Sequence, residues 1–422
     1  MTASSDLRYD VTIVGGGLVG GSLALALTAI GLKVALVERV PLRDVGKASY
    51  DDRTLALSLA SRRIFEGISL WPGLDDGVTP IRKVHVSNRG HFGTVTFEAS
   101  EYGLEALGYV AEGRVIGGAV AAELPRRDGL DLYIPAEVKA LDTTRGGATV
   151  ALATDDGSLV LRSALVVGAD GTHSTIRALM GLPAETHDYG HTAVIANVTP
   201  RHDHAGVAYE RMTTSGPLAV LPHVNGRCGI VWCTPSSQAQ DVLDLSDADF
   251  LQGLQQRFGY RLGRFQKAGA RASYPISRLY AARQVGERSL IIGNAAHTIY
   301  PVAAQGFNLG LRDVALLTEL VADAAGGDIG SPDLLERYQQ LRARDHQRMV
   351  QFTDGMIRVF APDLLGFNAL RSAGLVALQT LPFLKNALAR RTLGLGGHVP
   401  RLALGENLGQ ISGDDSKDSG HG

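Results

Sequence analysis

The sequence predicts an α/β fold in which a discontinuous Rossmann-like nucleotide-binding domain carries an inserted β-sheet domain and is followed by a C-terminal helical segment. A glycine-rich turn between a β-branched run and a helix, near the N-terminus, predicts the nucleotide-binding unit. Short strand-like runs that alternate with turn residues in the middle of the chain predict the second sheet. A strand and a glycine-rich loop near residue 293 return the chain to the first domain, so we expect a cleft between the domains, where ligands usually bind.

The length, 422 residues, exceeds the usual size of one domain. The expected boundaries are residues 8–80, 105–185 and 286–345 for the nucleotide-binding domain, 81–104 and 186–285 for the substrate-binding β-sheet domain, 346–400 for the C-terminal helical segment, and 411–422 for a disordered tail. The tail is polar and rich in glycine, a composition that cannot bury enough apolar surface to fold.

The local pattern predicts a first βαβ unit. Residues 11–14 are a short, strand-like run, residues 18–30 form a helix of small residues that ends at Gly31, and residues 33–37 form a second buried strand. This order, with glycines at the first strand-to-helix turn, is typical of a dinucleotide fold.

Four residues of this unit match the chemistry of nucleotide binding. Gly15 permits the tight turn, Gly17 lets the backbone approach a pyrophosphate at the helix N-terminus, and Gly20 lets helix and strand pack closely. Glu38, at the end of the second strand, is placed to accept hydrogen bonds from a ribose. The alternative is a glycine turn without a ligand, and the matching strand, helix and acid favour the nucleotide.

Two further glycine motifs follow in a fixed order. GADG occupies residues 168–171, and GNAAH at residues 293–297 runs into QGFNLG at residues 305–310, which opens a helix over residues 309–324. Open amides at that helix N-terminus can stabilise negative charge by up to ~2 kcal/mol. A strand that ends in a helix cap is the alternative for the last motif. Together the three motifs indicate a flavin site.

The middle of the chain predicts a sheet. Residues 84–97 alternate apolar and polar positions around Gly90 and Gly93, which indicates a hairpin. In the stretch from 186 to 285 only residues 247–258 look helical. Strand-like runs lie at residues 193–198, 218–221 and 229–233.

Composition and residue spacing give no support for nucleic-acid binding, a disulfide, a metal site or a signal peptide. The net charge of −2 and the pI near 6.6 give no electrostatic reason to bind nucleic acid. Cys228 and Cys233 would lie about 16 Å apart on one strand, too far to form a disulfide. The scattered histidines lack the spacing of a metal site, so no metal is expected. No signal peptide is apparent, which predicts a cytoplasmic protein.

Residues 355–391 are both apolar and basic. Five basic residues accompany one acid, while Gln379, Thr380 and Pro382 interrupt the apolar run and exclude a membrane span. The segment can lie on an anionic membrane, at the inner face of the plasma membrane, or bind a partner complex. The alternative is a helical pair that packs on the nucleotide-binding domain or in a homo-oligomer interface.

The three motifs together resemble the group A flavoprotein aromatic hydroxylases, the para-hydroxybenzoate hydroxylase superfamily. The resemblance covers roughly residues 8–400 and implies a Rossmann-like FAD-binding domain. The runs at residues 84–91, 193–198, 229–233 and 293–296 are most similar to its ubiquinone-biosynthesis branch, the 2-polyprenyl-6-methoxyphenol hydroxylases in particular.

The resemblance implies a set of cofactor-binding residues. Gly15, Gly17, Gly20 and Glu38 would hold the ADP half of FAD, with Arg53, otherwise a solvated loop cation, and Arg114 as further contacts. The remaining residues expected at FAD or at a transiently bound NAD(P)H are Asp170, Gly171, Arg177, Gly293, Asn294, Pro301, Gly306, Phe307 and Asn308. Many members of the superfamily have Asp where this chain has Asn294, so an amide contact replaces a carboxylate contact.

The implied reaction is hydroxylation of a polyprenyl phenol, with O₂ as co-substrate, through a flavin C4a-hydroperoxide. A base that removes the phenol proton would assist it. His297, Tyr300, Tyr209 and His223 are chemically able candidates, although packing or hydrogen bonding is the favoured role of each. The alternatives are another ring position, another aromatic substrate, or a flavin-binding assembly subunit of a quinone-biosynthesis complex.

Overall fold

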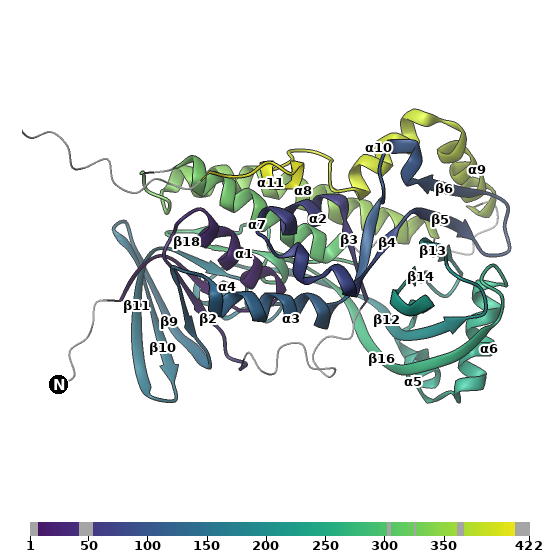
Figure 1. Ribbon diagram of the computed structural model, residues 1–422, viewed down its shortest axis with the longest axis horizontal. Coiled ribbons are helices and arrows are strands. Elements are labelled where there is room, and N and C mark those ends of the chain that lie inside the picture. Colours follow the sequence, from purple (N-terminus) through teal and green to yellow (C-terminus); the bar gives the residue numbers. More distant parts are fainter. Residues whose placement is uncertain (1–6, 42–53, 302–304, 325, 361–366, 410–422) are drawn as a thin grey trace, which may run out of the picture.

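The computed structural model describes residues 7–41, 54–301, 305–324, 326–360 and 367–409 (Figure 1). These residues form two eight-stranded sheets, one three-stranded sheet and a set of C-terminal helices. The expected disordered tail and Arg53 lie outside the described residues.

The first sheet forms the nucleotide-binding domain. Its strand order is β17 (Val285–Gly286), β18 (Ser289–Ile291), β11 (Gly157–Gly168), β1 (Arg8–Val14), β2 (Val34–Val37) and β8 (Leu130–Tyr133), with β10 (Gly147–Thr154) and β9 (Ala136–Thr144) extending from β11. The β1, β2, β8, β11 and β18 neighbours run parallel. Helix α1 (Leu18–Ala29) packs against α3 (Gly113–Glu123) and α7 (Gln305–Asp323), and α4 (Thr175–Leu179) follows β11.

Burial explains the composition of the parallel strands. All four residues of β2 are buried, as are five of the seven in β1, because both faces of the sheet are covered. Helices α1, α3 and α7 pack on one face, and β9, β10 and α4 pack on the other. Strand β18 returns to this sheet after the chain has built the second domain, and it pairs with β11 in parallel. The prediction of a discontinuous α/β domain is therefore confirmed.

A three-stranded sheet connects the two larger ones. It contains β3 (Thr54–Ser58), β7 (Gly108–Glu112) and β4 (Val78–Ile81). Helix α2 (Leu59–Gly67) follows β3 directly, and the Ser58 hydroxyl caps it by accepting a hydrogen bond from the Ser61 amide. Strand β3 and helix α2 both contact α7.

The second sheet is the inserted domain. Its order is β19 (His297–Thr298), β16 (Phe265–Tyr280), β12 (Glu185–Pro200), β15 (Cys228–Pro235), β14 (Leu218–Pro222), β13 (Val207–Met212), β5 (Lys83–Asn88) and β6 (Thr94–Glu98). The antiparallel β5–β6 pair confirms the predicted hairpin, with Gly90 and Gly93 at φ values of 74° and 104°. Strand β13 pairs in parallel with β5, so residues far apart in the chain form one sheet.

Two helices cover the second sheet, where the sequence predicted only one. Helix α6 (Asp247–Phe258) matches the prediction, but α5 (Ser236–Asp244) was missed. Helix α5 is short and buries only Ala239 and Val242, so few apolar residues mark it in the sequence, and it packs on β12. Cys228 and Cys233 are buried and free, as expected from their spacing.

The C-terminal segment is helical: α8 (Pro332–Phe360), α9 (Phe367–Thr380), α10 (Pro382–Thr392) and α11 (Arg401–Leu404). Pro382 separates α9 from α10 because proline is tolerated in the first turn of a helix. Helix α9 packs on β6 of the inserted sheet (Figure 1). Among the described helices, none has both the length and the apolar character of a membrane span. Short 3₁₀ turns complete the structure at Trp71–Gly73, Asp75–Gly77, Ala99–Tyr102, Leu124–Arg126, Val224–Gly226 and Gly293–Ala295.

Candidate active site

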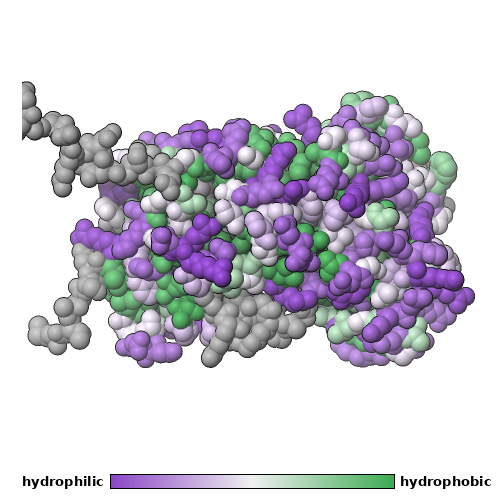
Figure 2. Space-filling model, in the orientation of Figure 1, coloured by the Kyte–Doolittle hydropathy of each residue, from purple (hydrophilic) through white to green (hydrophobic). Residues whose placement is uncertain are grey.

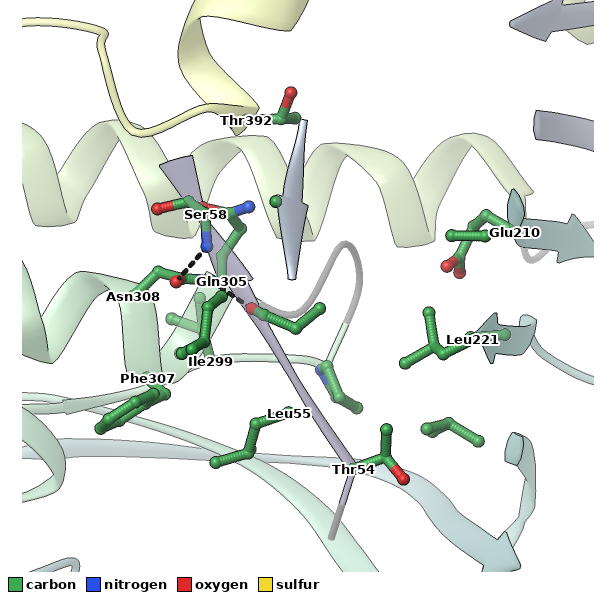
Figure 3. A pocket seen from close by; sticks show the side chains of 18 of the residues that line it. Thr54, Leu55, Ser58, Glu210, Leu221, Ile299, Gln305, Phe307, Asn308 and Thr392 are labelled. Carbon is green, nitrogen blue, oxygen red and sulfur yellow. Dashed lines mark hydrogen bonds between the residues drawn. The ribbon is translucent and has the colours of Figure 1, made fainter. Parts of the chain in front are cut away.

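A cavity of about 770 Å³ lies where the two domains and the C-terminal helices meet (Figure 3). Its wall combines glycine-rich turns of the nucleotide-binding domain with strands of the inserted sheet and with α9 and α10. The expected cofactor residues that line it are Gly17, Gly171, Gly293, Asn294, Pro301, Gly306, Phe307 and Asn308. The structure thus brings the three glycine motifs to one site.

The first motif is tight at two glycines and open at a third. A Cβ at Gly15, where φ is +105°, would lie 2.5 Å from the carbonyl oxygen of Ala169, and a Cβ at Gly20 would lie 1.9 Å from that of Gly15. A Cβ at Gly17 would meet no atom within 4 Å. Gly17 therefore borders open space at the N-terminus of α1, where free amides attract phosphate.

Glu38 closes the same turn from the next strand. Its carboxylate accepts hydrogen bonds from the Gly16 amide at 2.6 Å and from the Val40 amide at 2.8 Å. These bonds hold the carboxylate beside the glycine turn, the position expected of a residue that contacts a ribose.

The second motif orders a short helix. Asp170 accepts hydrogen bonds from the Ile176 amide at 3.1 Å and from the hydroxyl of Ser174, the N-cap residue of α4. Gly171 adopts φ +82° and leaves open space beside the cavity. Arg177 donates to the carbonyl oxygens of Ala295 at 2.7 Å and Thr172 at 2.9 Å, so it links the second motif to the third.

Buried hydrogen bonds hold the third motif in place. The Asn308 side chain accepts from the Ser58 amide at 2.8 Å and from the Ser61 hydroxyl at 2.7 Å, and it donates to the Ala56 carbonyl at 2.9 Å. The side chain of Asn308 thereby joins α7 to β3 (Figure 3). Asn294, by contrast, is exposed and lines the cavity.

A fully buried ionic cluster supports this motif from behind. Asp313 accepts hydrogen bonds from the Gly293 amide at 2.9 Å, His297 at 2.9 Å, His346 at 2.8 Å and Arg342 at 2.6 Å. These partners hold the pKa of Asp313 well below its usual range. The two histidines and Asp313 have the spacing of metal ligands, but Arg342 already neutralises the carboxylate.

Arg114 lies outside the cavity lining. It pairs with Glu112, whose other oxygen lies 3.0 Å from His223 Nε2. The guanidinium is half-exposed, and its neighbour Glu112 is buried.

The four expected bases do not present their rings to the cavity. His297 belongs to the buried cluster, and His223 pairs with Glu112. The Tyr300 hydroxyl bonds to the buried Cys233 thiol. Tyr209 borders the cavity, but its ring packs edge-on against Phe258, with centroids 5.1 Å apart, on the far face of the sheet.

Sequence reasoning missed Glu210. It lies on β13, lines the cavity, and directs its carboxylate inward (Figure 3). An acid that alternates with Ala208 and Met212 on one face of a strand is the signal that could have identified it.

The cavity fits FAD. The open backbone at Gly17 and Gly171 borders space that the pyrophosphate requires. Glu38 lies outside the cavity lining, beside the glycine turn, where it could contact the ribose. The N-terminal turn of α7, at Gly306 and Phe307, would lie along the flavin ring with its amides available for negative charge.

Comparisons with known proteins agree with this geometry. The model of the FAD binding domain family matches residues 8–353. The ubiquinone hydroxylase UbiL of Rhodospirillum rubrum is 36% identical over 413 residues, which cover 97% of this chain and 95% of that protein. The 3-demethoxyubiquinol 3-hydroxylase of Escherichia coli is 30% identical over 390 residues, 92% of this chain and 98% of that protein.

Solved structures show the same fold. The p-nitrophenol 4-monooxygenase PnpA of Pseudomonas putida superposes with a TM-score of 0.74 at 17% identity, over 93% of this chain and 99% of that chain. PqsL of Pseudomonas aeruginosa, a probable FAD-dependent monooxygenase, gives a TM-score of 0.71 at 22% identity, over 87% of this chain and 99% of that chain.

The chain therefore belongs to the FAD binding domain family, in the ubiquinone-biosynthesis branch of the FAD-dependent aromatic hydroxylases. It is an FAD-dependent monooxygenase that uses O₂, and NAD(P)H is the usual reductant of this family.

Proposed function

We propose that this enzyme hydroxylates the phenolic ring of a polyprenylated ubiquinone precursor, 2-polyprenyl-6-methoxyphenol. The observation that carries the proposal is the composition of the cavity, which continues from the glycine motifs into an apolar region. Val95 and Phe97 of β6 line that region together with Leu375 of α9 and Leu388 of α10. An isoprenoid tail would gain about 0.8 kcal/mol for each buried CH₂ in such surroundings.

The protein's part in this reaction is binding and exclusion of water. FAD, when bound, supplies the activation of O₂. The apolar side chains would hold the tail and so fix the ring at one depth in the cavity, beside the third glycine motif. The same apolar wall keeps water away from the reacting ring.

A second candidate is hydroxylation at another ring position. The name of the E. coli relative, 3-demethoxyubiquinol 3-hydroxylase, favours it. The two candidates share the tail and differ in the substituents on the ring.

The test offers both rings to the FAD-loaded enzyme, each with the same short prenyl chain, in the presence of NAD(P)H and O₂. We expect the methoxyphenol to stimulate NAD(P)H oxidation and to gain one oxygen atom, measured by mass spectrometry of the extracted product. Hydroxylation of the demethoxyubiquinol analogue alone would select the second candidate. NAD(P)H oxidation without oxygenation of either ring would contradict both.

We also propose that the substrate enters from a membrane surface at the junction of α9 and α10. Leu381, Phe383 and Leu384 are 41%, 68% and 36% exposed there, and Arg390 is exposed nearby. Figure 2 shows apolar residues that reach the surface at the end of the molecule where α9 lies. Arg391 is a poor probe of docking because it donates to the Arg348 carbonyl.

The variants Phe383→Ser and Arg390→Glu test this entry site. We expect both to weaken binding to vesicles of anionic lipid and to lower turnover of a long-chain substrate, while a short-chain analogue reacts normally. Tyr260→Ser, at an equally exposed aromatic residue of the inserted domain, is the matched control. Equal losses for long and short substrates would contradict membrane entry. A change in oligomeric state would indicate a homo-oligomer interface instead.

A further inference from the structure

We propose that Glu210 is the catalytic base that removes the phenolic proton of the substrate. The inference rests on the proposed function, since it requires that the substrate be a phenol. It adds to that function the residue that recognises the substrate hydroxyl.

The register of strand β13 in the inserted sheet places the side chain of Glu210 on the face that borders the cavity. On β13, Ala208, Glu210 and Met212 share the face that borders the cavity, whereas Tyr209 packs into the core on the opposite face. Pairing with β14 opposes Glu210 to Ala219, and parallel pairing with β5 opposes it to Val86. The position of the carboxylate is therefore fixed by two neighbouring strands.

The surroundings of Glu210 are apolar. Leu221 and Val231 lie on the same cavity wall, and no residue of the described chain donates a hydrogen bond to the carboxylate. The side chain is partly exposed, but the space it faces is the cavity. A carboxylate without a partner in such a place is costly, because buried charges are normally paired. A ligand with a hydroxyl donor would supply the missing hydrogen bond.

Glu210 lies across the cavity from the third glycine motif, so the ring of a substrate could lie between them. In Figure 3, Phe307 and Asn308 form one side of the cavity and Glu210 lies across from them. A phenol held between these walls would point its hydroxyl at Glu210 while its ring lies toward the glycine motifs. None of the four bases expected from the sequence has this position.

The surroundings of Glu210 shift the pKa of its carboxyl group toward neutral pH. Burial raises the pKa of Glu210 to about 7. The titratable groups that face it are the Cys233 thiol on β15 and the Tyr300 hydroxyl after β19. Burial raises the pKa of Cys233 to about 12 and also raises that of Tyr300, so both groups are neutral near pH 7. A base whose pKa lies near the working pH is the most effective one.

The proton step balances within the reaction. The phenolic O–H bond breaks, its proton moves to the Glu210 carboxylate, and the electron pair stays on the phenolate oxygen, from which it enriches the ring. The ring carbon then receives one oxygen atom from O₂ through the monooxygenase activity. When the ring becomes aromatic again, its carbon loses the displaced hydrogen as a proton, and the phenolate oxygen recovers one from Glu210.

The first test measures protons released on binding, without turnover. Calorimetric titration of the FAD-loaded enzyme, with no reductant present, is repeated in buffers of different ionisation enthalpy. A hydroxyl that donates to Glu210 favours the ionised carboxylate, so wild-type enzyme should release about half a proton per bound phenol at pH 7. The methyl ether of the same phenol should release none. Glu210→Gln should release none with either ligand.

The second test measures turnover against pH. We expect Glu210→Gln to lower kcat/KM on the order of 100-fold and to abolish the rise in activity as pH increases through about 7. Glu210→Asp, which keeps a carboxylate, should retain the rise at a reduced rate. Glu137→Gln, on an exposed part of β9 away from the cavity, is the control and should match wild type in both tests.

The outcomes separate this inference from the proposed function. If the wild type hydroxylates the phenol while Glu210→Gln shows the same proton release and the same pH profile, Glu210 is not the base and the proposed function stands. If Glu210→Gln is slow but keeps the pH profile, the residue serves binding alone and the inference is overturned. If the wild type neither binds nor hydroxylates any phenol, both fail.

Discussion

A side chain at Gly17 should block FAD binding without disturbing the fold, so Gly17→Val is an informative perturbation. Its φ and ψ of −67° and −170° suit a β-branched residue, and a Cβ there meets no atom within 4 Å. Valine is a poorer N-cap than glycine, but it also lowers the entropy of the unfolded chain. These effects oppose each other, so the stability of the FAD-free protein should change by less than about 1 kcal/mol.

The same side chain would occupy the space beside the α1 N-terminus that lines the cavity. FAD at 100 times its Kd should stabilise the wild type by about 2.7 kcal/mol, and this stabilisation should vanish in Gly17→Val. Gly20→Val should behave differently, because a Cβ 1.9 Å from the Gly15 carbonyl oxygen forces the turn open. It should cost about 1–3 kcal/mol or more in the FAD-free protein.

The assay combines the flavin absorbance of the purified protein with denaturant unfolding, with and without added FAD. Gly118→Val is the matched control, since Gly118 is exposed on α3 and a Cβ there also meets no atom within 4 Å. It should retain FAD. Equal flavin content in Gly17→Val and wild type, or unfolding of the FAD-free variant, would refute the assignment of Gly17 to the pyrophosphate.

Two further predictions concern the buried supports of the third motif. Asn308→Ala leaves the Ser58 amide and the Ala56 carbonyl without their partner, which should cost about 1–3 kcal/mol for each buried group in a urea unfolding experiment, and an unchanged midpoint would contradict it. Burial lowers the pKa of His346 to about 3, so its protonation favours the unfolded chain, and stability should fall by up to about 1.4 kcal/mol per pH unit as pH drops from 6.5 toward 3. His346→Gln should flatten this dependence, and an equal slope in variant and wild type would contradict it.

The sequence located the parts of the site that depend on local backbone geometry. Gly15 and Gly20 are required by close backbone contacts within one turn, so their spacing is visible in the sequence. The hydrogen bonds of Arg177 are not visible in the sequence, because its partners are the carbonyls of Thr172, in the same loop, and of Ala295, far along the chain. Backbone carbonyls leave no signature in a sequence.

The proposed base, Glu210, could not be predicted either, because its position depends on pairing between distant strands. Tyr209 and Glu210 are adjacent, and only the register of β13 with β5 and β14 decides which of them faces the cavity. That register depends on strands more than 100 residues apart in the chain. The chemically attractive tyrosine therefore packs against Phe258, and the acid beside it lines the site.

We propose that this FAD-dependent enzyme inserts one oxygen atom from O₂ into the ring of a prenylated phenol. The most direct measurement is the mass of the product formed under ¹⁸O₂ by FAD-loaded wild-type enzyme with NAD(P)H and a short-chain 2-prenyl-6-methoxyphenol. We expect a ring-hydroxylated product that carries one ¹⁸O atom. A product whose new oxygen comes from water, or reductant consumption with the phenol recovered unchanged, would contradict it.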